Sequence, residues 1–128
     1  MEEDIVVEER SPWAEIVGPC YSVASFARAT GTTKQEVRAA AAELRVLVLM
    51  TLDGVELLPS FQVRDGEIVP QLRPILETLR GGINDPWTWA QWLNVETDSA
   101  GRHIDDLWAG AFESTKLEAR HTAWAWAR

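Results

Sequence analysis

The side chains that most often carry out catalysis or bind metals are few in this sequence, and they lie far apart. His103 and His121 are eighteen residues apart, with no cysteine or carboxylate at the spacing of metal ligands, so no metal site is predicted. His103, Asp105 and Asp106 together could suggest acid–base chemistry. Three polar residues at the start of a short helix are, however, more often a helix cap and a solvated first turn, and we interpret all three so.

The one cysteine of the chain, Cys20, cannot form an internal disulfide and is predicted to be a small buried hydrophobe rather than a nucleophile. No glycine-rich phosphate-binding loop is present. We therefore expect a non-enzymatic protein that needs no cofactor. The single cysteine and the acidic start, which lacks the order of a signal peptide, favour a cytoplasmic location. No stretch is apolar and long enough to cross a membrane.

Charge is distributed unevenly along the chain. Its 128 residues carry a net charge of -8, which argues against non-specific binding to nucleic acid or anionic lipid. Residues 1–18 and 53–128 each carry a net charge of -5, whereas residues 19–52 carry +2. The basic residues of this one positive segment are Arg28, Lys34, Arg38 and Arg45.

The same basic segment predicts two helices joined by a tight turn, over residues 21–45. Ser22 is a plausible N-cap of the first helix, and Gly31 suits the turn because glycine tolerates the left-handed conformation. Thr33 and Glu36 have the spacing of a capping box for the second helix. The predicted apolar stripes are Val23, Phe26 and Ala27, then Val37, Ala40, Ala41 and Leu44.

This pair of helices has the spacing of a helix-turn-helix. Its second helix would present Thr33, Lys34, Gln35 and Arg38 outward, and these residue types suit base edges and phosphates. The alternative is a helical corner used only for packing. A dimer, or a partner that completes the surface, would favour DNA binding over that alternative.

Two Asp-Gly pairs follow, Asp53-Gly54 and Asp65-Gly66, each between apolar or alternating residues. Each predicts a hairpin with a type I′ turn, in which both central residues have positive φ. A hairpin directly after the second helix makes the module look winged.

Four helices are predicted in the second half. They are a helix that starts near Pro74 and ends at Gly81-Gly82, one that Asp85-Pro86 opens, a short one closed by Gly110, and one over residues 111–126. In the second of these, Trp89, Trp92 and Leu93 share one face and are predicted core. Trp87 lies on the polar face, as an interface anchor or as a lid over the helix N-terminus.

The chain ends in HTAWAWAR, where Trp124 and Trp126 are two residues apart and cannot share one helical face. Either this helix is buried on two sides, or one of the two rings meets a partner.

After the predicted helix-turn-helix, the chain carries a series of short motifs: Pro59-Ser60-Phe61-Gln62, Gly66, Pro70, Leu72, Trp87, Trp92-Leu93, Gly101-Arg102, Leu107 and Gly110. This order of parts, over about residues 20–112, resembles the Xre/MbcA/ParS-type antitoxins. Two departures are the loop NVETDSA, which lacks the family's proline, and His103-Ile104, where the family has a proline after Gly-Arg.

The resemblance implies a protein partner, a RES-type toxin that consumes NAD, and repression of the protein's own operon. The last helix and Trp124 to Arg128 would face the toxin, and Lys34, Gln35 and Arg38 would face the operator. The expected partner-binding residues are Trp87, Arg102, His103, Trp124, Trp126 and Arg128.

We therefore predict a mainly α protein with one or two short β-hairpins. Residues 1–18 form an acidic arm, 19–69 a winged helix-turn-helix-like module and 70–128 a helical toxin-binding-like domain. The expected function is that of an antitoxin and transcriptional regulator, in a homodimer or hetero-oligomer. The alternatives are a stand-alone DNA-binding regulator, phage-related in origin, that dimerises through the C-terminal module, and a protein–protein adaptor with a vestigial helix-turn-helix.

Overall fold

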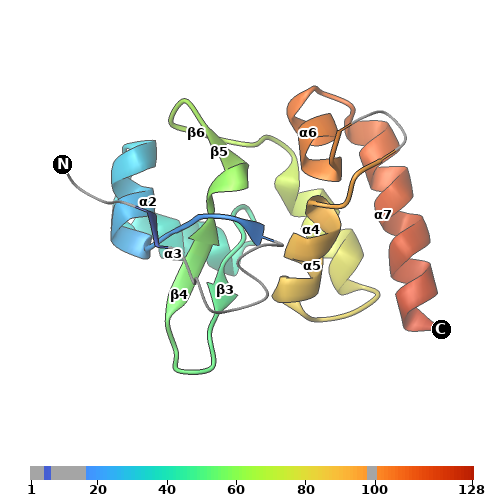
Figure 1. Ribbon diagram of the computed structural model, residues 1–128, viewed down its shortest axis with the longest axis horizontal. Helices are drawn as coiled ribbons and strands as arrows, with labels where there is room; N and C mark the ends of the chain where they lie inside the picture. The colour runs from blue at the N-terminus through green and yellow to red at the C-terminus, as the bar shows by residue number, and fades with distance from the viewer. Residues whose placement is uncertain (1–4, 7–16, 98–100) are drawn as a thin grey trace. The chain divides into compact units, whose positions relative to one another are not determined.

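The computed structural model describes residues 5–6, 17–97 and 101–128, and helices dominate it (Figure 1). The chain divides into two compact units, Met1–Ile68 and Val69–Arg128. Short antiparallel strands occur only in the first unit among these residues. The prediction of a mainly α protein with short hairpins is confirmed. Within the described ranges, no helix has both the length and the apolar character to span a membrane.

The first unit is built on α2 (Val23–Thr30) and α3 (Lys34–Ala42), which begin and turn where the sequence predicts. The hydroxyl of Ser22 caps α2 and that of Thr33 caps α3, each within a capping box. Gly31 ends α2 in the left-handed conformation, at φ 69°. The two helices therefore pack against each other across a turn of three residues.

The end of α3 differs from the prediction, because Leu44 does not continue the apolar stripe of the helix. Leu44 takes a left-handed φ of 62°. Its N–H donates to the carbonyl of Ala41 at 3.1 Å, and the N–H of Arg45 donates to that of Ala40 at 2.9 Å. These two bonds form a Schellman motif, which usually has glycine at this position, so the sequence carried no sign of it.

Four short strands form one antiparallel sheet in the order β1 (Ile5–Val6), β2 (Cys20–Tyr21), β4 (Glu56–Pro59) and β3 (Leu49–Met50). Cys20 pairs with Pro59, and Leu49 pairs with Leu57. The predicted acidic arm thus contributes a strand, which local sequence signals did not reveal.

The two Asp-Gly hairpins differ in their turns. Asp65 and Gly66 both have positive φ, 52° and 78°, between β5 (Val63–Arg64) and β6 (Glu67–Ile68), as a type I′ turn requires. Between β3 and β4 only Gly54 is left-handed, and its N–H donates to the carbonyl of Thr51 at 3.0 Å. The predicted type I′ turn is wrong there, since this longer loop combines an ordinary turn with a glycine bulge.

Apolar side chains from α2, α3 and β4 fill the first unit. The ring of Tyr21 meets that of Phe26 edge-on, with centroids 5.8 Å apart. A short 3-10 turn, η1 (Ser60–Gln62), buries the amide of Gln62, which accepts from the N–H of Leu47 at 2.8 Å and donates to its carbonyl at 2.9 Å. The buried core residues are Val23, Phe26, Ala27, Val37, Ala40, Val46 and Leu58.

The second unit contains α4 (Leu72–Arg80), α5 (Pro86–Leu93), α6 (His103–Trp108) and α7 (Phe112–Ala127). Helix α7 packs mainly on α4 and buries a small-residue face, Thr115, Ala119 and Ala123. Just after α4, a Cβ atom on Gly82 would lie 2.5 Å from the carbonyl oxygen of Ala123. Only glycine permits this close approach, which holds α7 in place.

Candidate functional site

The exposed face of α3 carries the residues predicted to read DNA. Lys34 and Gln35 lie in its first turn and Arg38 one turn later, and all three side chains are exposed. Val37 and Ala40, on the opposite face, are buried in the core of the first unit. The structure therefore places two cationic side chains and one amide on a single outward face of a short, well-anchored helix.

Thr33 forms the predicted capping box with Glu36. Its hydroxyl accepts from the N–H of Glu36 at 3.0 Å, while the Glu36 carboxylate accepts from the N–H of Thr33 at 2.9 Å. The hydroxyl is thus occupied in the cap and sets where α3 begins. Of the four residues predicted to read DNA, Lys34, Gln35 and Arg38 are the ones whose side chains are not part of this cap.

Arg38 is linked to the neighbouring hairpin by a weak ion pair. Its Nη2 lies 3.6 Å from Oε1 of Glu56 on β4, and the two side chains are 59% and 34% exposed. An exposed pair of this kind contributes at most about 1 kcal/mol. The guanidinium can therefore exchange Glu56 for an external phosphate at little cost.

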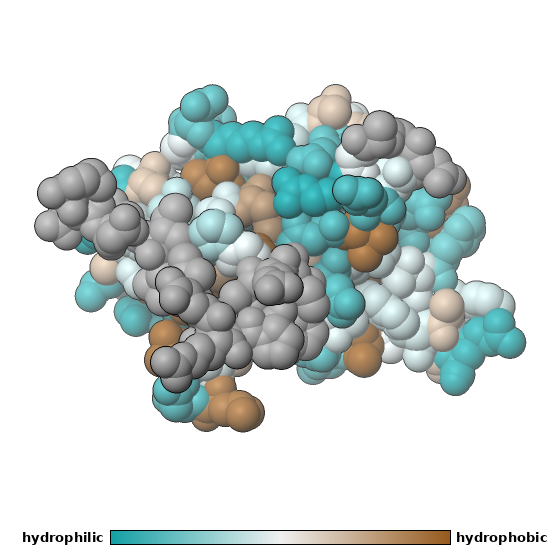
Figure 2. Space-filling view, in the orientation of Figure 1, coloured by the Kyte–Doolittle hydropathy of each residue, from teal (hydrophilic) through white to brown (hydrophobic). Residues whose placement is uncertain are grey.

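The β3–β4 hairpin ends in apolar side chains (Figure 2). Leu52 is fully exposed at 109%, and Met50 and Val55 are about half exposed. Asp53 also lies in this loop, so the hairpin tip itself adds no positive charge.

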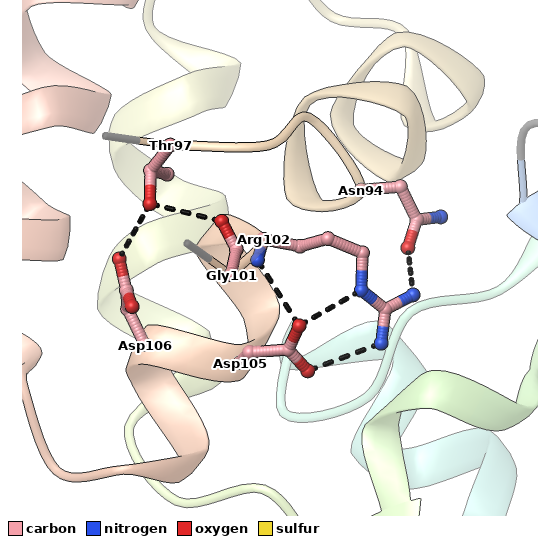
Figure 3. Close-up of polar contacts among 6 residues, drawn as sticks. All are labelled: Asn94, Thr97, Gly101, Arg102, Asp105 and Asp106. Atoms are coloured by element: carbon pink, nitrogen blue, oxygen red, sulfur yellow. Dashed lines mark hydrogen bonds and ion pairs between the residues drawn. The ribbon is translucent and has the colours of Figure 1, made fainter. Parts of the chain in front are cut away.

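In the second unit, Arg102 is the centre of a polar network before α6 (Figure 3). Its Nε and Nη2 donate to the two carboxylate oxygens of Asp105 at 3.0 and 3.1 Å. Its Nη1 donates to Oδ1 of Asn94 at 2.7 Å. The predicted partner-binding guanidinium is thus engaged within its own unit, where it joins the end of α5 to the start of α6.

His103, predicted to bind a partner, is buried at 7% exposure and does not lie on an open surface. Its imidazole stacks on the indole of Trp92, with centroids 3.8 Å apart. Burial lowers the pKa of His103, and the charges of Glu118 and Asp106 raise it by less. Within the described ranges its Nδ1 has no hydrogen-bond partner. The interpretation as a solvated first turn is therefore wrong for this residue.

A pocket of about 420 Å³ adjoins His103. It lies between the segment after α5, α6 and α7, and three carboxylates line it, those of Glu96, Asp106 and Glu118. Thr97 donates from its hydroxyl to the carbonyl of Gly101 at 2.9 Å and to Asp106 at 3.3 Å, and so forms part of the wall (Figure 3). Sequence reasoning missed this pocket because its walls come from three separate elements.

The tryptophans divide as predicted. Trp89 and Trp92 are buried, and their indole N–H groups donate to the carbonyl of Ile83 at 2.8 Å and to Oγ1 of Thr122 at 2.9 Å. Trp87 is half-buried, which fits the predicted lid better than an exposed interface anchor.

At the end of α7, Trp124 is 65% exposed and Trp126 is half-buried. The guanidinium of Arg128 lies 4.5 Å from the centroid of the Trp124 ring. The exposed ring is therefore Trp124, with Arg128 beside it. Of the predicted partner-binding residues, these two are the ones on an open face.

Cys20 is buried, and burial raises its pKa to about 11. A thiol with this pKa stays protonated near neutral pH, so it is unsuited to act as a nucleophile. Across the described ranges, no three histidine, cysteine or acidic side chains come together as metal ligands would.

Comparison with known proteins indicates the fold alone. No family model matches the chain, and no curated protein matches it. Among solved structures, the chain is similar to the NMR structure of Rv2175c, with a TM-score of 0.69 and 20% sequence identity. The similarity covers 82% of this chain and 81% of that one. It therefore extends over parts of both units, at an identity that carries fold and not function.

Proposed function

We propose that this chain is a DNA-binding regulator whose first unit acts as a winged helix-turn-helix. The observation that carries the proposal is the exposed face of α3, with Lys34, Gln35 and Arg38 side by side above a buried Val37. In this proposal α3 is the recognition helix and α2 crosses the DNA backbone. The β3–β4 hairpin takes the place of the wing.

The side chains of α3 suit this task. A glutamine amide can bind adenine through two hydrogen bonds in the major groove, and Lys or Arg can bind guanine or phosphate. Gln35 lies at the N-terminal end of α3, the end that reaches base edges in helix-turn-helix proteins. Gln35 would therefore supply sequence preference, and Lys34 and Arg38 would supply most of the electrostatic attraction.

The charge of the whole chain sets the expected strength of binding. With a net charge of -8, long-range attraction to DNA is unfavourable. Affinity must come from the local contacts of α3, so it should be modest for one copy and fall steeply with salt. Two copies on a two-fold symmetric site would double these contacts, which is why a dimer is part of the proposal.

A gel shift on the DNA upstream of the gene tests this. The double variant Lys34→Ala with Arg38→Ala should lose binding by about tenfold or more, since each lost contact costs about 1 kcal/mol. The matched control is Arg73→Ala with Arg80→Ala, which removes the same two charges from exposed positions of α4. Equal loss in both variants would mean that only net charge matters, and that α3 does not read the DNA.

A second candidate function, neutralisation of a toxin, is favoured by one specific observation. Trp124 is 65% exposed near the end of α7, and Leu117, seven residues earlier on the same face, is 51% exposed. Exposed tryptophan beside arginine is typical of the centre of a protein interface. This surface suits a protein partner, and the resemblance to Xre/MbcA/ParS-type antitoxins suggests a RES-type toxin.

Co-purification with the product of the neighbouring gene tests the second candidate. Trp124→Ala should abolish the complex, whereas Trp126→Ala should weaken it less because that ring is half-buried. A complex that survives Trp124→Ala unchanged would argue against this face as the interface. The DNA-binding proposal does not depend on this result.

A further inference from the structure

The pocket beside His103 has a composition that neither proposed function explains. Its lining includes three carboxylates, Glu96, Asp106 and Glu118, and no lysine or arginine. Glu96 and Glu118 are exposed and Asp106 is half-buried, so the pocket presents negative charge to a ligand that enters from solvent. Within the described ranges, no ion pair holds Glu96 or Glu118.

The hydroxyl groups of the wall add acceptors rather than donors. Ser114 and Thr115 both donate to the carbonyl of Ala111, at 3.2 and 2.8 Å. With their protons used in this way, their oxygens are left with lone pairs to offer. The pocket is therefore rich in hydrogen-bond acceptors.

His103 supplies an independent sign that something binds here. It lines the pocket and is only 7% exposed. Its Nδ1 has no hydrogen-bond partner in the described part of the chain. A buried polar atom without a partner is unusual in a folded protein. Stacking on Trp92 fixes the plane of the ring.

The volume and the ligands exclude a bare metal ion as the best occupant. About 420 Å³ is in the range of pockets for small organic ligands. No three side chains of the described residues lie as metal ligands would. An organic cation with several N–H donors fits both the size and the excess of acceptors, and a guanidinium offers five donors.

We propose that this pocket binds a guanidinium group, with Glu118 and Asp106 as its charge partners and His103 as a neutral acceptor. The group can come from a small molecule or from an arginine side chain of a protein. Burial favours the neutral form of His103, and a neutral imidazole accepts a hydrogen bond without repelling the cation.

Calorimetric titration of the full chain with argininamide tests the proposal. Citrullinamide is the matched control ligand, because it has the same length and an uncharged urea in place of the guanidinium. We expect saturable binding of argininamide and at least about tenfold weaker binding of citrullinamide. Equal binding of the two, or no binding of either, would overturn the proposal.

Two variants of α7 make the test specific to the pocket. Glu118→Gln keeps the shape and removes one charge of the lining, and should weaken argininamide binding about tenfold. Glu113→Gln removes a charge from the exposed start of the same helix, outside the pocket, and should leave binding unchanged. Equal effects of the two variants would show a general charge effect and contradict the site. Circular dichroism confirms that each variant is folded.

A second titration identifies the source of the guanidinium. A blocked Ala-Arg-Ala peptide presents the side chain as a protein would, whereas argininamide retains a free amino group. Tighter binding of the peptide supports a protein partner, and tighter binding of argininamide supports a small ligand. Binding of neither compound overturns the proposal in both forms.

Discussion

The imidazole of His103 lies flat on the indole of Trp92, with an interplanar angle of 9° and centroids 3.8 Å apart. The Trp92 N–H in turn donates to Thr122 on α7. The ring stack therefore joins α5 to α6, and the hydrogen bond joins α5 to α7. The side chains of Trp92 and His103 are both at most 7% exposed.

This stack predicts that stability depends on pH. Burial lowers the folded-state pKa of His103 below the ordinary value of 6.5 for histidine, so the unfolded chain takes up the proton at a higher pH than the folded chain does. The stabilisation is full above the unfolded pKa and is lost as pH falls from about 6.5 toward the folded pKa. Urea denaturation at several pH values should show a falling free energy of unfolding over this range.

The variant His103→Phe separates the titration from the stack. Phenylalanine can still stack on Trp92 but cannot be protonated, so its stability should vary less with pH than that of the wild type. His121→Phe, at an exposed position of α7, is the control and should keep the wild-type pH dependence. If the stability of His103→Phe varied with pH as that of the wild type does, the pH dependence could not come from the titration of His103.

The contact of Gly82 with Ala123 predicts a position that tolerates no side chain. In Gly82→Ala the new Cβ would meet the Ala123 backbone at 2.5 Å, which forces α7 away from α4. Overpacking of this kind costs about 1–3 kcal/mol. Gly81→Ala is the comparison, because its Cβ would lie 3.3 Å from the nearest atom. Thermal unfolding of both should show the larger decrease in melting temperature for Gly82→Ala.

The network of Arg102 predicts a modest and geometry-dependent contribution to stability. Its side chain and that of Asp105 are 38% and 34% exposed, so solvent screening limits the loss in Arg102→Ala to about 1 kcal/mol. Arg102→Lys should not restore it, because an ammonium cannot form the two-pronged contact with Asp105. Denaturant unfolding measures both. Full rescue by lysine would mean that charge alone holds the network.

The amide of Gln62 predicts a larger effect. In Gln62→Leu the buried N–H and carbonyl of Leu47 lose the partners that they have at 2.8 and 2.9 Å. Unsatisfied buried groups cost about 1–3 kcal/mol each. The free energy of unfolding should therefore fall by about 3 kcal/mol. A loss below that of Arg102→Ala would contradict the importance of this bond pair.

Local signals in the sequence predicted the helices well and long-range contacts poorly. The caps at Ser22, Thr33 and Asp85 depend on residues within three positions of each other, so they could be recognised directly. The pairing of Ile5–Val6 with Cys20–Tyr21 depends on chain separated by more than ten residues. No periodic pattern in the sequence predicts a pairing between strands so far apart along the chain.

The candidate sites show the same limit. The exposure of Lys34, Gln35 and Arg38 followed from helical periodicity, and the structure agrees. The burial of His103 could not be predicted from helical periodicity, because it depends on the approach of Trp92 from another helix. The two turns differ for a similar reason, since Asp-Gly is compatible with both a type I′ turn and a glycine bulge.

The salt dependence of binding to the upstream DNA tests the central proposal most directly. Each phosphate contact contributes a slope of about -0.9 in a plot of log affinity against log salt concentration. Replacement of Lys34 and Arg38 by alanine should therefore make the slope less steep by the contribution of about two phosphate contacts. Replacement of Arg73 and Arg80 by alanine should leave the slope unchanged. The same slope in the wild type and in the α3 double variant would contradict DNA binding through this helix.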